Sequence, residues 1–561
     1  MAATASSGGD DVRSRGQQSP LASQRKDSNT STEAKSKGRF SQFFPLGYKE
    51  AASQWWASVP AAAAEHMVLS YVPYLQQPPT HTQTGTETPS ASSSANSISD
   101  SDKNKATPVT TNTQNDPYGP RQWHSTLVKL SGKNRAINEF SVERVGEKVD
   151  QNLVMLHGYG AGLGFFYKNF EGLSRVKGWK IYALDMLGMG RSSRPPFKIH
   201  AKEREASITE AENFFIDALE EWRIKRKIER FTLLGHSLGG YMAVAYALKY
   251  PGHLNKLVLA SPVGIPEDPN AVAAEMPSEE LSSSGLANEF TQDQEEITRT
   301  SNSQLPDAAK TTGDNNNFLN ARSKNNTRSD TNTTQAPRRS TPKWLTYLWD
   351  ANISPFSIVR WSGPLGPRFV SGWTSRRFSH LPPDQAQALH TYAYTLFKQR
   401  GSGEYALAYI LAPGAFARSP LIRRIAGVGR QMITPSGSTT HSISEAASAT
   451  PSPSPLALKK ETGLPVILMY GENDWMDIDG GFAAQNKLNA ERERVLKEAG
   501  EEEKKLEGGE AKVLVIKKAG HHVYLDGWEE FNDVMQGEMK DVGERERKRE
   551  EVLASLSRSS K

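Results

Sequence analysis

The sequence contains no cysteine and no long apolar run. The absence of cysteine among 561 residues excludes disulfides and a thiol nucleophile, and it is compatible with a reducing compartment. No stretch stays apolar over the roughly 18 residues that a transmembrane helix requires. Neither sign of charge predominates, because the sequence contains 68 Lys and Arg and 63 Asp and Glu. A net charge of +5 is too small to indicate nucleic-acid binding.

Several segments are poor in apolar residues. Segments 76–118, 266–340 and 431–460 consist largely of Ser, Thr, Asn, Gln and Pro, so they cannot bury enough surface to offset their ordering entropy. We expect them to be a disordered linker and two disordered insertions. The leader, residues 1–39, is expected to be disordered as well. It resembles a transit peptide in its basic residues and serines but carries acidic residues, which such peptides usually lack. Residues 543–561 read as a charged tail.

The remaining segments alternate between strand and helix patterns. Two early strands followed by strand–helix alternation predict a mostly parallel, eight-stranded sheet with helices on both faces. The predicted strands are 125–130, 138–145, 152–156, 180–185, 231–235, 256–260, 464–470 and 511–517, and the helices are 165–176, 207–228, 238–250 and 479–500. About 200 residues separate the sixth and seventh strands, far more than a crossover needs. We therefore expect a core formed by 119–265 and 461–542, with a helical cap, 341–430, inserted between them.

The stretch LLGHSLGGYMAVAYALKYP (233–251) carries the strongest functional signal. A buried strand leads into Gly-His-Ser-Leu-Gly and then into a helix, which is the context of a nucleophile elbow. Gly235 and Gly239 leave room for the backbones that meet at such a tight turn. The following helix directs its amino-terminal N–H groups toward a developing oxyanion. Ser237 is therefore the candidate nucleophile.

A serine nucleophile needs a base and an acid, and both candidates follow predicted strands. The order Ser, Asp/Glu, His is met by Asp474 in LPVILMYGENDWMD (464–477) and by His521 in AKVLVIKKAGHHVYLD (511–526). Asp477 and Asp479 are interpreted as caps of the next helix. We choose His521 over His522 as the base, because it comes first after Gly520 at the strand end.

The oxyanion site has its own glycine-rich turn. In NLVMLHGYGAGLGFF (152–166), a third buried strand runs into His-Gly-Tyr-Gly-Ala-Gly, where a backbone N–H can point at a reacting carbonyl oxygen. The expected donors are the amides of Tyr159 and Leu238, with Gly160 as an alternative. Asp185, in DMLGMGRSSRP (185–195), is interpreted as a structural residue that holds the loops near the elbow.

Residues 40–75 are rich in aromatic side chains. Phe43, Phe44, Trp55 and Trp56 are of the kind that settles at a membrane interface, whereas Pro60 and Glu65 argue against a membrane span. We expect this segment to lie on a membrane surface. Packing of the same helix on the protein's own core or cap remains the alternative.

Together, these motifs resemble the α/β-hydrolase-domain subfamily four/five. The resemblance rests on GHSLGGY, HGYGAGLGFF, DMLGMGRSSRP, the cap sequence SGPLGPRFV and GHHVYLD, and it covers about 120–265, 342–426 and 463–540. Within this group, the chain is most similar to the fungal cardiolipin-specific deacylase and to the N-acyl-phosphatidylethanolamine lipase. The group also contains lipase activators. It implies the α/β-hydrolase fold with an inserted cap.

The resemblance also implies an activity. It favours a serine acyl hydrolase that deacylates glycerophospholipids, with cardiolipin the favoured substrate, and that needs neither a metal nor an organic cofactor. A lysophosphatidic acid acyltransferase or transacylase is an alternative, since the family's His-x-x-x-x-Asp pattern is matched by His521 and Asp526. We interpret Asp526 instead as a cap of the helix beginning near Trp528. A second alternative is a non-catalytic lipase activator, but those activators lack the serine that Ser237 retains.

The expected partners are a phospholipid substrate and a membrane surface, with no nucleic acid. The family and the leader together favour a mitochondrial protein, peripheral on the inner membrane. The cytosol or the surface of a lipid droplet is the alternative.

Overall fold

The computed structural model describes residues 44–73, 109–110, 116–267, 352, 354–412, 415–433 and 459–559. The leader, nearly all of the linker and most of both predicted insertions lie outside these ranges, as does the candidate membrane residue Phe43.

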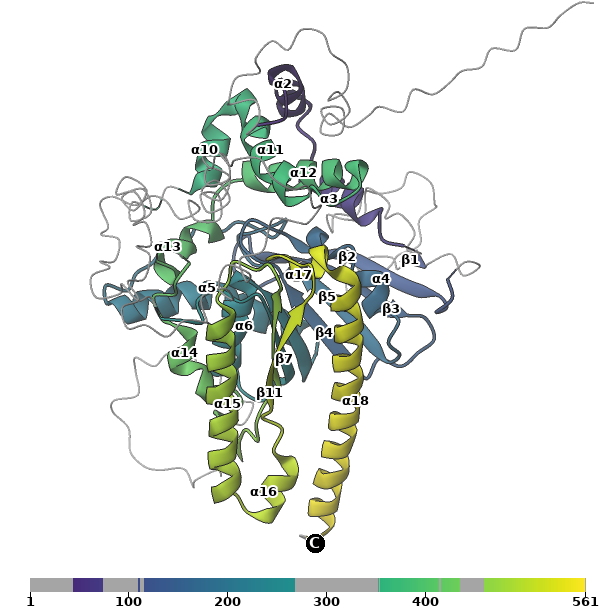
Figure 1. The fold of residues 1–561 in the computed structure, drawn as a ribbon, viewed down its shortest axis with the longest axis vertical. Helices are drawn as coiled ribbons and strands as arrows, with labels where there is room; N and C mark the ends of the chain where they lie inside the picture. Colours follow the sequence, from purple (N-terminus) through teal and green to yellow (C-terminus); the bar gives the residue numbers. More distant parts are fainter. Residues whose placement is uncertain are drawn as a thin grey trace, which may run out of the picture.

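A nine-stranded mixed sheet forms the centre of the molecule (Figure 1). Its strands are β1 (Val109–Thr110), β2 (Arg121–Lys129), β3 (Ala136–Arg144), β4 (Gln151–Leu156), β5 (Trp179–Leu184), β6 (Phe231–His236), β7 (Leu254–Ala260), β10 (Val466–Gly471) and β11 (Ala511–Ile516). The order is β1-β2-β3-β5-β4-β6-β7-β10-β11, with antiparallel pairing from β1 to β5 and parallel pairing beyond. All eight expected strands are present, and the two-residue β1 is added at one edge. The expected fold is confirmed.

Helices cover both faces of this sheet. On one face lie α5 (Arg204–Lys225), α6 (Leu238–Lys249) and α15 (Ile478–Glu498), and on the other lie α4 (Phe170–Leu173), α17 (Val523–Asp526) and α18 (Trp528–Ser559). Side chains alternate accordingly: in β4, Leu153 and Met155 pack under α18, whereas Val154 and Leu156 pack under α5 and α6. The parallel strands are therefore buried on both sides.

Three helical details differ from the sequence predictions. The helix expected over 165–176 is divided into a 3₁₀ turn, η3 (Leu163–Phe166), and the short α4. The charged run after α15 contains a second helix, α16 (Glu501–Leu506). Helix α18 continues unbroken past residue 543, where the composition suggested a separate tail.

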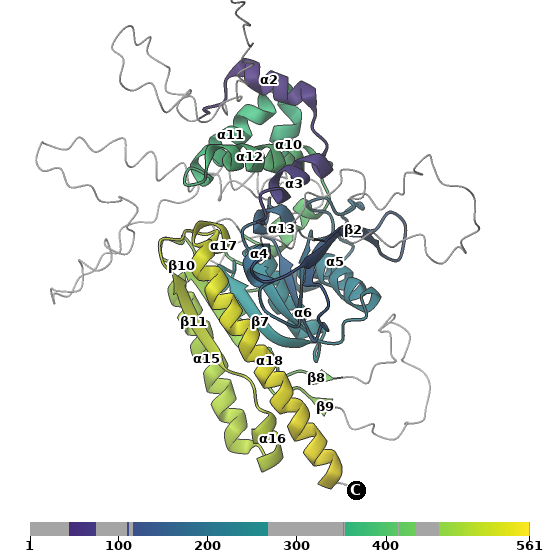
Figure 2. The ribbon, with the colours of Figure 1, turned by 90° about the vertical axis from the view of Figure 1, so that its right-hand side faces the viewer.

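The cap stands above the carboxyl ends of the strands (Figure 2). Its segments are α10 (Pro355–Trp361), η5 (Gly363–Leu365), α11 (Gly366–Arg377), α12 (Pro383–Lys398), η6 (Gly403–Ala406) and α13 (Leu407–Ile410). The inserted chain then continues beside the core, where α14 (Leu421–Arg424) and η7 (Ile425–Gly427) pack on α15 (Figure 1). A small antiparallel pair, β8 (Met432–Ile433) and β9 (Lys459–Lys460), lies where the chain returns toward the core.

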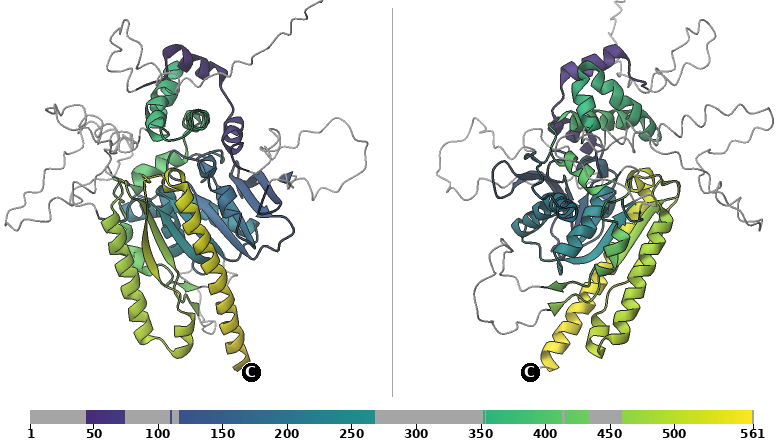
Figure 3. Two further views of the ribbon diagram at one scale, coloured as in Figure 1. Left: turned by 45° about the vertical axis from the view of Figure 1, so that its right-hand side comes forward. Right: turned by 90° about the vertical axis from the view of Figure 1, so that its left-hand side faces the viewer.

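Two amino-terminal helices join this cap (Figure 3). Helix α2 (Tyr48–Ala57) packs on η5 and α11, and α3 (Ala61–Leu69) packs between α12 and η3. Apolar side chains from α3 enter the core, including Ala64 and Val68. The segment 44–73 is thus an integral part of the cap–core structure.

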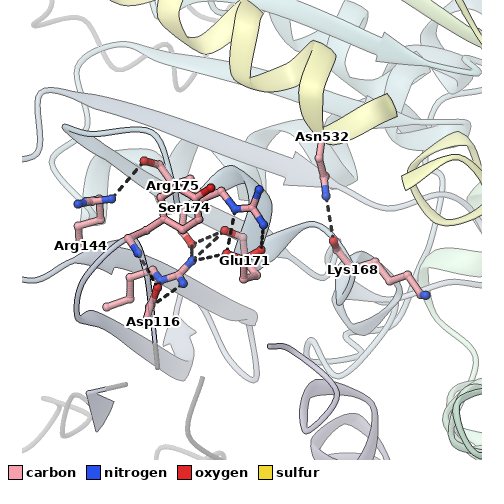
Figure 4. A network of polar contacts seen from close by, with 9 residues as sticks. Asp116, Arg144, Lys168, Glu171, Ser174, Arg175 and Asn532 are labelled. Carbon is pink, nitrogen blue, oxygen red and sulfur yellow. Dashed lines mark hydrogen bonds and ion pairs between the residues drawn. The ribbon is translucent and has the colours of Figure 1, made fainter. Parts of the chain in front are cut away.

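A polar network fastens α4 to β2 and α18 (Figure 4). The buried Arg121 of β2 donates to Asp116, at 2.6 Å, and to the Glu171 carbonyl and Ser174 hydroxyl of the α4 region. On the α18 side, Asn532 donates to the carbonyl oxygen of Lys168 (3.0 Å). The hydrogen bonds offset the desolvation cost of these buried groups, so the network fixes α4 beside the sheet.

Candidate active site

Ser237 lies on a strained turn between β6 and α6. Its φ of 52° and ψ of −115° are unfavourable for a residue with a side chain, as a nucleophile elbow requires. The turn is possible because backbones meet closely on both sides. A Cβ at Gly235 would come within 2.2 Å of the Gly239 carbonyl oxygen, and one at Gly239 within 2.6 Å of the Leu156 carbonyl oxygen. Ser237 is held at the carboxyl edge of the sheet and is 7% exposed.

His521 and Asp474 come together beside this elbow. Nδ1 of His521 lies 3.1 Å from Oδ1 of Asp474, and both side chains are buried. Burial by itself would raise the pKa of Asp474. The neighbouring His521, the Ser261 hydroxyl and the Met476 amide outweigh that effect, so the pKa of Asp474 is lower than usual. The carboxylate therefore stays ionised and can orient and stabilise a protonated imidazole.

The turns that carry acid and base pack backbone to backbone. A Cβ at Gly471, the last residue of β10, would lie 2.3 Å from the Gly520 carbonyl oxygen. His236, next to the nucleophile, uses Nε2 to donate to the His521 carbonyl oxygen (3.0 Å). Nε2 of His521 is buried and has no hydrogen-bond partner among the described residues. The structure thus leaves the second imidazole nitrogen of His521 available for a proton.

The glycine-rich turn after β4 lies directly against the elbow. A Cβ at Gly158 would be 2.8 Å from Nδ1 of His236 and 3.1 Å from Cβ of Ser237, so a side chain here would displace the elbow residues. Tyr159 stacks on Phe356 of the cap, with ring centroids 5.2 Å apart. Gly160 has a positive φ of 69°. The amide of Leu238 opens α6, where the first N–H groups of a helix have no acceptor within the helix. The structure therefore places the turn that carries Tyr159 and Gly160 against Ser237, with Leu238 directly after the nucleophile.

Asp185 holds this turn in place. Its Oδ1 accepts from the Leu163 amide (2.7 Å), and its Oδ2 accepts from the Arg191 amide (2.7 Å) and the Asn138 side chain (2.8 Å). All three donors belong to segments around the elbow, in keeping with the structural role expected for Asp185.

Asp526 does not cap α18, contrary to the sequence interpretation. Its Oδ2 accepts from the Gly520 amide (3.1 Å), and its Oδ1 lies 3.5 Å from Nε2 of His380 in the cap. Burial raises the pKa of Asp526. Asp526 thus supports the loop that carries His521. Asp477 occupies the N-cap position of α15 but makes no side-chain capping bond.

His522 points away from Asp474 into the core. Its ring lies among those of Phe165, His236 and Tyr524, and burial lowers its pKa well below the usual value. The base loop is also tied to α4, because Asn169 donates both to the Tyr524 carbonyl oxygen and to Asn532 (2.9 Å each). Since Asn532 is part of the network in Figure 4, helix α18 helps to position His521.

A cavity of about 400 Å³ lies on the cap side of the candidate site. Its walls include Lys198, Ser357 and Trp361, together with Phe197, Ile199, Asn352, Tyr405 and Tyr409. Aromatic and polar side chains both line this cavity, and Lys198 is the one cation among the residues named.

The outer surface of the cap exposes large apolar side chains. Trp56 is 82% exposed and Trp361 is 72% exposed, and the same surface includes Tyr48, Ile358 and Leu365. They come from α2, α10 and η5, and α2 and α10 both pack on η5. We name these five residues the apolar cap surface. All of them except Trp56 were missed from the sequence, although Ile358, Trp361 and Leu365 recur at a helical i, i+3, i+7 spacing.

Of the three expected membrane residues that the structure describes, Trp56 is the one with a largely exposed side chain. Trp55 is half-buried and packs against the core cluster, and Phe44 packs edge-on to Phe369 with Arg368 above its ring. Both therefore contribute to folding, and Trp56 is left as the exposed member. In the part of the chain that the structure describes, no helix is long and apolar enough to cross a bilayer. The same residues hold no cluster of three His, Asp or Glu side chains that could bind a metal.

Comparison with known proteins gives consistent matches. The model of one family, described as the α/β hydrolase fold, matches residues 151–527. A 1-acylglycerol-3-phosphate O-acyltransferase from Arabidopsis thaliana is 27% identical over 402 residues, which cover 71% of this chain and 68% of the relative. The mouse 1-acylglycerol-3-phosphate O-acyltransferase ABHD5 is 27% identical, and the match covers 74% of this chain and 83% of the mouse protein. A (lyso)-N-acylphosphatidylethanolamine lipase from Bos taurus is 25% identical, and the match covers 68% of this chain and 78% of the lipase.

Proposed function

Since this chain belongs to the α/β hydrolase family, with relatives in its subfamily four/five, we propose that it is a serine acyl hydrolase that deacylates glycerophospholipids. The observation that carries the proposal is the paired His521 and Asp474 beside Ser237 on its strained elbow. A set of buried groups in this order serves acyl transfer in this fold.

The proposed reaction proceeds through an acyl-enzyme. His521 accepts the Ser237 proton as the hydroxyl oxygen attacks the ester carbonyl, and Asp474 stabilises the imidazolium that forms. The amides of Tyr159 and Leu238 hold the oxyanion. His521 then protonates the leaving lysolipid oxygen, and water, activated by the same base, releases the fatty acid and restores Ser237.

Acyl transfer is the second candidate. The same acyl-enzyme would acylate a lysophospholipid if that alcohol replaced water, and two of the relatives carry acyltransferase names. The His521–Asp526 pattern gives this candidate no separate site, because Asp526 is bonded to the backbone of the base loop. A lipase activator that does no chemistry is disfavoured by the intact Ser237.

We propose that the phospholipid reaches the site from a membrane. The apolar cap surface is of interfacial type, and Trp361 belongs both to this surface and to the wall of the 400 Å³ cavity. In this proposal, Trp361 links the bilayer surface to the cavity. Lys198 in the cavity wall suits an anionic headgroup.

The finer assignments rest on resemblance alone. We propose cardiolipin as the substrate, in membrane acyl-chain remodelling, and the mitochondrial inner membrane as the location. The cytosol and the lipid-droplet surface are the alternatives for location. Both proposals are independent of the triad chemistry.

Product analysis tests the proposal. Purified wild-type protein and Ser237→Ala are incubated with vesicles of phosphatidylcholine, phosphatidylethanolamine and cardiolipin, with and without added lysophosphatidate. Released fatty acid and lysocardiolipin that depend on Ser237 would support deacylation. Phosphatidate formed from the lysolipid without free fatty acid would favour the transferase, and equal products from both proteins would refute an enzymatic role for Ser237.

A further inference from the structure

A fully buried carboxylate lies close to the oxyanion turn and comes from outside the α/β core. Glu65, on helix α3, is 0% exposed. Its Oε1 accepts from the Arg191 guanidinium at 2.5 Å, and its Oε2 accepts from the Asn138 side chain at 3.0 Å and the Tyr392 hydroxyl at 3.3 Å. Asn138 belongs to β3, Arg191 to the connection that follows β5, and Tyr392 to helix α12. Glu65 therefore joins the core to the cap.

Each of these partners also contacts the turn 157–164 or the residue that holds it. We name this turn the oxyanion loop. Asn138 donates to Asp185, which accepts from the Leu163 amide (2.7 Å). The Tyr392 hydroxyl accepts from the Gly164 amide (3.3 Å). Glu65 is therefore one bonded partner away from two attachment points of the oxyanion loop.

Several charged groups meet in this cluster. Glu65 is ion-paired with the guanidinium of Arg191, and Asp185 accepts from the backbone amide of the same residue. The other titratable groups facing the two carboxylates are Arg194, which acts on Asp185, Tyr392, and the buried His157, whose Nε2 lies 3.7 Å from Asp185. Burial raises the pKa of Glu65 to about 7, and the nearby Asp185 acts in the same direction. Burial of an ionised Glu65 therefore has a desolvation cost, which the Arg191 ion pair and the hydrogen bonds from Asn138 and Tyr392 offset.

We propose that Glu65 is a positioning residue for the reaction at Ser237, holding the oxyanion loop through Arg191, Asn138 and Tyr392. The inference rests on the proposed esterase function. It makes the amino-terminal helix α3 part of the machinery that places the Tyr159 amide, although α3 lies outside the matched family region. Ionised Glu65 keeps Arg191 bonded at the loop, and neutral Glu65 weakens that bond.

The test compares Glu65→Gln with wild type on a short soluble ester such as p-nitrophenyl butyrate. The expected result is a kcat lower by roughly tenfold to hundredfold at pH 8.5, because small displacements of catalytic groups have effects of this size. KM should change less than about twofold, since the ester does not contact Glu65. The matched control is Glu50→Gln, the same change at an exposed position of α2, which should leave kcat and KM unchanged.

A pH series separates positioning from a merely structural role. The two proteins differ only at residue 65, so the ratio of wild-type to Glu65→Gln kcat reports Glu65 itself. We expect this ratio to be near one at pH 5.5 and to increase through pH 7 to its full value at pH 8.5. A ratio that is constant over this range, or one throughout, would refute the proposal.

Two further measurements cover folding and the underlying chemistry. Glu65→Gln should melt below wild type, because it removes the charge that faces the buried Arg191. Its kcat should still be reduced at temperatures well below its melting temperature, where the variant is fully folded, and a wild-type kcat there would refute positioning. If Glu65→Gln does not fold, Tyr392→Phe removes the hydroxyl that links Glu65 to Gly164 and should reduce kcat without changing KM. An unchanged kcat there would contradict the proposal. Wild type that neither cleaves the ester nor reacts with a fluorophosphonate would overturn the proposed function instead.

Discussion

At the scale of single residues, the candidate site is a set of buried polar groups that fix one another's charge and position. The ionised Asp474 orients His521, and the carbonyl of His521 is bonded to the histidine that precedes Ser237. Ser237, Asp474 and His521 were recognisable in the sequence because each follows an apolar strand in a short, glycine-containing turn. The role of Asp526 could not be recognised in the sequence, because its partners are the Gly520 amide and the distant His380. Local sequence does not specify such tertiary contacts.

Substitution of the nucleophile or the base should remove activity without unfolding the protein. We expect Ser237→Ala and His521→Ala each to reduce kcat by about 10⁴-fold or more, and the double variant to resemble either single one, because the residues act as a unit. His522→Ala is the matched control and should retain most activity. Kinetics on a soluble ester, with melting curves, check this, and an inactive His522→Ala beside an active His521→Ala would contradict the choice of base.

Asp474 predicts a pH dependence of stability. Its pKa is lower in the folded protein than its usual value of 3.8, so its ionised form contributes stability above that pH and the contribution is lost as the pH decreases through the folded value. Asp474→Asn should lack this contribution. The difference in free energy of unfolding between wild type and Asp474→Asn, measured in urea, should therefore decrease from pH 6 to pH 3. A difference that increases toward low pH would contradict the assigned charge.

At the scale of elements, α2 and α3 combine two roles. Their inner side chains, among them Trp55 and Val68, pack on cap and core, and Trp56 remains outside. The aromatic content predicted an interfacial segment, but the sequence could not separate the inner from the outer tryptophan. That distinction depends on η5 and α11, which lie about 300 residues further along the chain. In the sequence, Glu65 served only as an argument against a membrane span, and its burial between core and cap could not be predicted.

The two tryptophans should therefore respond differently to substitution. Trp56→Ala with Trp361→Ala should reduce vesicle binding and vesicle-lipid hydrolysis together, while short-ester kcat and melting temperature stay near wild type. Trp55→Ala should instead destabilise the fold by roughly 1–3 kcal/mol, because it removes a half-buried ring. Liposome flotation beside melting curves distinguishes the two. Unchanged flotation of the double variant would refute membrane contact through the apolar cap surface.

At the scale of the whole molecule, the sequence predicted the sheet and the inserted cap but not how the chain closes on itself. The alternation of strands and helices and the long gap between the sixth and seventh strands can be read directly from the sequence. The return of the amino terminus to the cap cannot be read from it, and it depends on contacts such as the Leu46 amide with the Ser371 hydroxyl (3.3 Å). Residues 44–73 thereby complete the surface over the candidate site.

Two deletions test this organisation. Removing residues 1–73 should lower the melting temperature and solubility, because it exposes the apolar surface that α3 covers and leaves Arg191 without Glu65. Removing 270–338, whose composition offers few apolar side chains, should leave short-ester activity intact. Circular dichroism and ester kinetics check both. A stable, fully active protein without residues 1–73 would contradict the role assigned to α3.

The central claim, that Ser237 is an activated nucleophile, is tested most directly by fluorophosphonate labelling followed by peptide mass spectrometry. The account predicts one phosphonate adduct per chain, on the peptide that contains Ser237, with labelling slowed strongly in His521→Ala. An adduct that persists in Ser237→Ala, or a wild-type protein that does not react, would contradict it.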